Sequence, residues 1–137
     1  MKAKFGALVA CLSLIWSGAA LVAHHSFSTE YDGAKTFSVK GKVSKVEWTN
    51  PHVRFYVDVA DPAGKVTTWN MELASPSALA RNGWTSRTLK VGDQVAVEGY
   101  AAKVAPDRGA ARSVVTADGR SLFGGAADDG APAPGGN

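Results

Sequence analysis

Three histidines, His24, His25 and His52, are the residues of this chain best suited to bind a metal ion. Neutral imidazole is a common protein ligand for copper, zinc and nickel. If the mature chain begins at His24, its free amine adds a nitrogen donor that is partly unprotonated near neutral pH, because an α-amino group has a pKa of about 7.7–8.0. Several nitrogen donors suit tetragonal Cu(II). We therefore predict a metal site at these histidines, with copper favoured over other divalent transition metals.

A structural or solvent-facing role is the alternative for all three histidines. A histidine that follows Asn50-Pro51 can simply form a hydrogen bond within a turn, without binding a metal. His52 has the parity opposite to Val53, so we expect its side chain to point away from the core. That orientation permits metal binding without requiring it.

A second hypothesis needs no metal and uses an exposed aromatic face. Trp48, Asn50, Tyr56 and Trp84 would form this face and bind a protein, a peptide or a glycan. Packing in the core or at its rim is the alternative for the tryptophans. The chain has neither a Gly-x-Ser-x-Gly turn nor a glycine loop that cradles phosphate, so we do not expect an enzyme and assign no catalytic residue.

The first 23 residues have the pattern of a secretory signal peptide. Lys2 and Lys4 precede an apolar run over residues 5–22, and small residues allow cleavage after Ala20 or Ala23. We expect the protein in the periplasm or secreted, and in contact with a membrane only through this segment before cleavage. Cys11, the one cysteine, lies inside the segment, so the mature chain would carry no thiol.

Charge also limits the partners that we expect. Loss of Lys2 and Lys4 would leave 13 Lys and Arg residues against 12 Asp and Glu residues. Because no basic stripe remains to attract a polyanion, we do not expect a nucleic-acid partner. We expect a monomer whose partner is a protein or a small ligand.

Apolar and polar residues alternate over several segments, which is the period of half-buried strands. The first two strands are expected over residues 37–48 and 53–59, and a change of phase near Ser44-Lys45 indicates a bulge in the first. Asp61-Pro62-Ala63-Gly64 predicts a hairpin turn before a third strand over residues 69–73. A fourth strand is expected over residues 95–100, and a fifth strand or a final hairpin over residues 112–123. The expected core is Val39, Val43, Val53, Phe55, Val57, Trp69, Met71, Val95 and Val97.

Ser75-Pro76 predicts the start of a short helix, and Asn82-Gly83 predicts its end. A helix between the third and fourth strands favours a small five-stranded OB-like barrel, and a small β-sandwich is the alternative. We expect a signal peptide over residues 1–23, an amino-terminal arm over 24–36 and the barrel over 37–123. The Gly-, Ala- and Pro-rich residues 124–137 are expected to form a disordered tail.

Several short strings resemble those of one protein family. They are His24-His25-Ser26-Phe27, Gly41-Lys42-Val43, Glu47-Trp48-Thr49-Asn50-Pro51-His52, Trp69, Glu72, Leu79, Gly83-Trp84 and Leu89-Lys90-Val91-Gly92-Asp93. Together they look like DUF6152, a family of exported bacterial proteins of unknown function, over about residues 24–122. The resemblance implies export and a small β domain, and it brings no established activity.

Overall fold

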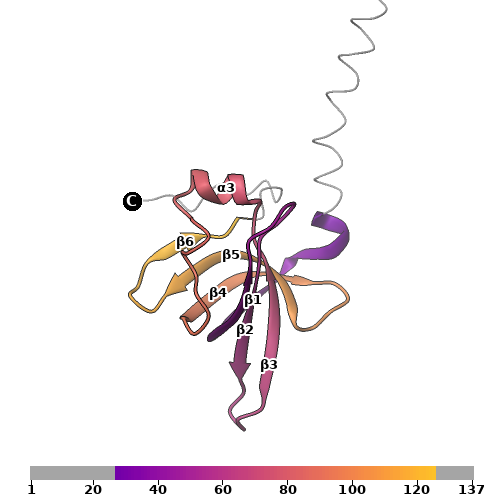
Figure 1. Ribbon diagram of the computed structural model, residues 1–137. Coiled ribbons are helices and arrows are strands. Elements are labelled where there is room, and N and C mark those ends of the chain that lie inside the picture. Colours follow the sequence, from indigo (N-terminus) through magenta and orange to yellow (C-terminus); the bar gives the residue numbers. More distant parts are fainter. Residues whose placement is uncertain (1–26, 126–137) are drawn as a thin grey trace, which may run out of the picture.

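The computed structural model describes residues 27–125. Residues 27–30 are helical and lead directly into the first strand. The elements are β1 (Tyr31–Glu47), β2 (Arg54–Ala60), β3 (Val66–Glu72), α3 (Pro76–Arg81), β4 (Gln94–Ala102), β5 (Arg108–Thr116) and β6 (Ser121–Phe123). Figure 1 shows α3 at one end of the sheet structure and the turn between β2 and β3 extending from the other end.

The strands close into a barrel. The sheet order is β3-β2-β1-β4-β5-β6, and an additional parallel pairing joins β3 to β5. This pairing completes a ring of β1, β2, β3, β5 and β4, with the helix between β3 and β4, which is the OB arrangement. The structure therefore confirms the predicted five-stranded OB-like barrel with one short helix, and it excludes the sandwich. β6 lies outside the ring and pairs with β5 alone among the described strands.

β1 bends sharply enough to pair with two neighbours. Its pairing with β2 shifts register between Val43 and Lys45, which confirms the predicted bulge. Gly41 allows the close approach of β2, because a Cβ atom at that position would lie 2.2 Å from the backbone oxygen of Asp58. The bend places the first half of β1 against β4 and the second half against β2.

β1 also begins earlier than the sequence pattern indicates. The predicted domain starts at Phe37, whereas the strand starts at Tyr31, within the predicted arm. Polar residues between these two positions hide the alternation, and the pairing with β4 is irregular between Tyr31 and Thr36. Tyr31 is nevertheless buried, because it packs with Ala102 and Ala110 in a small second cluster outside the main core.

The main core matches the expected set closely. Of the expected residues, Val39 and Trp69 are partly buried against the core, and the others are fully buried. The core also contains Leu73 directly after β3, Leu79 in α3, Leu89 in the following loop and Val114 in β5. The hydrophobic side chains inside the ring therefore hold the barrel together.

Local signals also place the helix and the turns as predicted. Ser75 caps α3 by accepting a hydrogen bond from the amide of Ala78, and Gly83 follows the helix with a φ of 83°. Asp61 accepts amide hydrogen bonds from Ala63 and Lys65 in the turn between β2 and β3. No helix within residues 27–125 is long and apolar enough to cross a membrane.

The predicted end segments fall largely outside the described residues. The proposed signal peptide lies wholly outside them, as do residues 126–137 of the predicted tail. Gly124 and Gly125 of this tail are described. The amide of Gly124 donates to the backbone oxygen of Arg112, and its own oxygen accepts from the amide of Ala74. Backbone hydrogen bonding therefore continues past β6 into the first residue of the predicted tail.

Candidate functional site

His52 lies on the outside of the barrel beside a buried carboxylate. Its neighbour Val53 enters the core, so the predicted outward orientation of His52 is confirmed. Nδ1 of His52 is 2.6 Å from Oε1 of Glu72, and the His52 side chain is 31% exposed. Nδ1 of His52 therefore contacts the protein, and the side chain is partly exposed.

Glu72 holds this position because of where β3 places it. Met71 and Leu73 enter the core on either side, so the Glu72 side chain turns to the outer face of the sheet. Arg54 lies opposite Glu72 in the pairing of β2 with β3. The start of β1 covers the pair, and only 5% of Glu72 is exposed.

Four side chains converge on this carboxylate. The Tyr31 hydroxyl donates to Oε2 of Glu72 at 2.7 Å, and Nη2 of Arg54 donates to the same oxygen at 2.5 Å. Nη2 of Arg108 lies 3.9 Å from Oε2, and the same nitrogen contacts the carboxylate of Glu30. We call Tyr31, His52, Arg54, Glu72 and Arg108 the Glu72 cluster.

The cluster compensates for the burial of a charge. A buried carboxylate without partners would be strongly destabilising, and here two guanidinium groups and an imidazole offset its desolvation. Burial raises the pKa of the Tyr31 hydroxyl, and its hydrogen bond to Glu72 raises that pKa further. Tyr31 therefore stays protonated and donates to Glu72 throughout the physiological pH range.

The contact between His52 and Glu72 resembles the carboxylate–histidine pairs found beside metal ions in proteins. Histidines that ligate metals usually donate their second ring N–H to a carboxylate, which fixes the ring and its tautomer. A neutral His52 that donates Nδ1–H to Glu72 carries its lone pair on Nε2. Within residues 27–125, however, no three His, Cys, Asp or Glu side chains are grouped so as to hold a metal ion. His24 and His25 lie outside the described residues, so their positions stay a prediction.

The predicted aromatic face is corrected at Trp84. Trp84 is only 3% exposed and belongs to the core, where its indole N–H donates to the backbone oxygen of Phe123. Trp48 is half-buried against the core, while Asn50 is exposed. Tyr56 is half-buried on the outer face, and its hydroxyl donates to Glu47. A position at the end of an element did not predict exposure, because the Trp84 amide donates to the backbone oxygen of Leu79 and its side chain packs in the main core.

Sequence reasoning did not assign the residues that surround His52. Glu72 stands among Met71, Leu73 and Ala74, and a single charge within an apolar run is a signal that could have identified it. Arg54 could have followed from the register of the predicted hairpin. Tyr31 and Arg108 join the site only through the closed barrel, and no local pattern indicates them.

Comparisons with known proteins identify a family without an assigned activity. No curated protein matches the chain. Solved structures that are similar to part of it include Rim1, a mitochondrial single-stranded DNA binding protein from S. cerevisiae, and the N-terminal domain of PriB from Thermoanaerobacter tencongensis. Rim1 has 12% sequence identity and a TM-score of 0.48, and the alignment covers 61% of this chain and 93% of Rim1. PriB has 17% identity and a TM-score of 0.42, with coverage of 61% and 96%.

The family model matches residues 11–111, which is most of the chain. It includes β1, β2, β3, α3 and β4, and therefore His52, which precedes β2, and the strand that carries Glu72. The chain belongs to DUF6152, a family of unknown function.

Proposed function

We propose that this protein is an exported binding module that holds a divalent transition metal, with copper favoured, through His52 together with His24 and His25. The observation that carries the proposal is the 2.6 Å contact between Nδ1 of His52 and Oε1 of Glu72. Glu72 is itself fixed by Tyr31 and Arg54, so the imidazole is held by a rigid part of the barrel. A fixed ring loses little conformational freedom when a metal binds, which favours affinity.

The start of β1 supports the participation of the other two histidines. Tyr31 and His52 contact the two oxygens of the same carboxylate, so the first residue of β1 is anchored beside His52. His25 precedes Tyr31 by only six residues. Six residues span at most about 20 Å when fully extended, so this tether keeps His24 and His25 within reach of His52. The sequence alone suggested a longer arm, because it placed the first strand at Phe37.

The proposal is tested by titrating tag-free protein that begins at His24 with Cu(II), in competition with a chelator of known affinity. The free peptide His24-His25-Ser26-Phe27 measures the contribution of the amino terminus alone. We expect the protein to bind Cu(II) more tightly than the peptide. His52→Ala removes one imidazole that would bind Cu(II), and we expect its affinity to fall to that of the peptide. Glu72→Gln, which leaves the ring but disturbs its orientation, is expected to weaken binding by about tenfold.

Tyr56→Phe is the control variant, because the Tyr56 side chain, like that of His52, lies on the outside of the barrel but bonds to Glu47 rather than to Glu72. It is expected to bind Cu(II) as the unmodified protein does. Circular dichroism confirms that each variant is folded before it is titrated. Equal affinities for the protein, His52→Ala and the peptide would contradict the proposal.

A further inference from the structure

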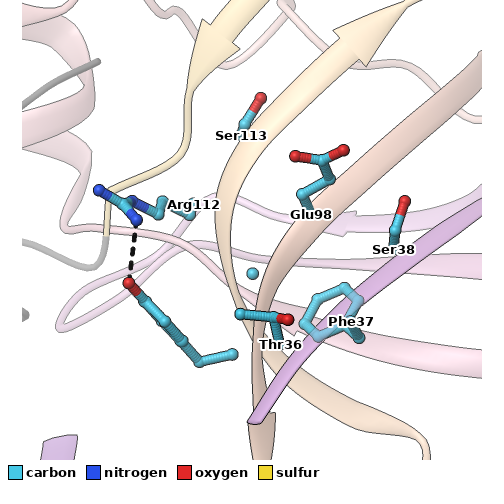
Figure 2. Close-up of a pocket in the computed structure, with 8 residues that line it drawn as sticks. Thr36, Phe37, Ser38, Glu98, Arg112 and Ser113 are labelled. Atoms are coloured by element: carbon cyan, nitrogen blue, oxygen red, sulfur yellow. Dashed lines mark hydrogen bonds between the residues drawn. The ribbon is translucent and has the colours of Figure 1, made fainter. Parts of the chain in front are cut away.

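A separate hollow lies on the outer face of β1, β4 and β5. It has a volume of about 390 Å³ and is lined by Thr36, Phe37, Ser38, Glu98, Gly99, Tyr100, Arg112 and Ser113. Figure 2 shows Arg112 on one side of the hollow, and Glu98 and Ser38 on the other side. The volume lies within the range of about 300–1,000 Å³ that is typical of small-molecule sites.

Strand register explains why polar groups gather at this place. Ser38 of β1 pairs with Glu98 of β4, and Glu98 pairs with Ser113 of β5. Directly paired residues point to the same face, so the three side chains form one polar row across the barrel. The register shift between Glu98 and Gly99 interrupts this face, and a bulge of this kind re-aims the side chains beside it.

Two opposite charges border the hollow and do not pair with each other. Within residues 27–125, the Glu98 carboxylate accepts no hydrogen bond and forms no ion pair. Arg112 is held in place by Tyr100, because its Nη1 donates to the phenol oxygen at 3.0 Å and its guanidinium lies 5.8 Å from the ring centroid. The guanidinium keeps further N–H donors for a ligand.

We infer that this hollow binds a small zwitterion of the α-amino acid class. The ammonium group of the ligand would approach Glu98 and the hydroxyls of Ser38 and Ser113, while its carboxylate would accept hydrogen bonds from Arg112. A ligand with one charge would be attracted by one of these groups and repelled by the other. A neutral polyol could form hydrogen bonds with both groups but would supply neither with an opposite charge. The inference does not depend on the metal site, because none of the lining residues belongs to the Glu72 cluster.

The test is an NMR titration of the full mature chain with L-alanine, followed through the amide signals of Ser38, Gly99 and Ser113. We expect saturable shifts confined to the hollow, with weak affinity because the site is open to solvent. Glu98→Gln and Arg112→Gln each remove one charge, and each is expected to weaken binding by about tenfold. Arg87→Gln is the matched control, because Arg87 is an exposed arginine that does not line this hollow.

Acetate, methylammonium and glucose are titrated as separate probes of one charge or none. We expect each to shift the same amide signals much less than L-alanine at equal concentration. Absence of saturable shifts with L-alanine, or equal shifts with glucose, would overturn the inference. Unchanged L-alanine binding in both Glu98→Gln and Arg112→Gln would also overturn it. None of these results bears on Cu(II) binding, so the two proposals fail separately.

Discussion

Replacing Glu72 by glutamine tests the electrostatics of the site most sharply. The substitution keeps the shape of the side chain but removes the charge that Arg54 contacts at 2.5 Å and His52 at 2.6 Å. The new amide group also turns a donor toward other donors. Breaking a fully buried ion pair costs about 3–5 kcal/mol. Because the Arg54 and His52 side chains are 25% and 31% exposed, solvent offsets part of this loss, and we expect a destabilisation of about 2 kcal/mol.

Thermal unfolding followed by circular dichroism measures this effect. For a domain of this size, 2 kcal/mol corresponds to a decrease in Tm of roughly 8–16 °C. Glu98→Gln is the matched control, because it makes the same change at an exposed carboxylate that has no partner within the described residues. A change of less than about 0.5 kcal/mol is expected there. If both variants unfolded at the same temperature, the cluster would not stabilise the barrel and the reasoning would be refuted.

Two further predictions concern the start and the bend of β1. Gly41→Ala places a Cβ atom against the backbone oxygen of Asp58, so we expect the free energy of unfolding in urea to decrease by about 3 kcal/mol or more. In the control Gly33→Ala the new Cβ meets no atom within 4 Å, so we expect little change. Equal stabilities of the two variants would contradict the close approach of β1 and β2. The raised pKa of Tyr31 means that the unfolded state releases this proton from about pH 10 while the native state retains it, so stability is fully present below pH 10 and decreases above it. Between about pH 10 and 12, the free energy of unfolding is expected to decrease faster in the unmodified protein than in Tyr31→Phe, by up to about 1.4 kcal/mol per pH unit; parallel curves would exclude this role of Tyr31.

Much of the barrel could be predicted because its signals are local. The bulge near Lys45 follows from a change in alternation, the turn at Asp61 from its residue types, and the helix from Ser75 and Gly83. Together these elements limited the fold to two alternatives. Closure through the pairing of β3 with β5 decided between them, and this pairing joins segments that are distant in the sequence.

The surroundings of His52 could not be predicted in the same way. The parity of His52 gave its orientation, but the contact between Tyr31 and Glu72 joins residues 41 positions apart. Tyr31 precedes five polar or small residues that carry no strand pattern, so its burial becomes visible only when β4 and β5 are in place. Trp84 shows the opposite error, because the sequence analysis assigned it to an exposed binding face and the structure buries it in the core.

The central claim is that a histidine fixed by Glu72 binds a metal together with the histidines that precede β1. Electron paramagnetic resonance of the Cu(II)-loaded protein tests it directly, with mass spectrometry confirming that the chain begins at His24. The account predicts nitrogen hyperfine couplings from His52, and therefore a different spectrum for His52→Ala. Identical spectra for the unmodified protein and His52→Ala would show that His52 does not ligate the ion and would contradict the account.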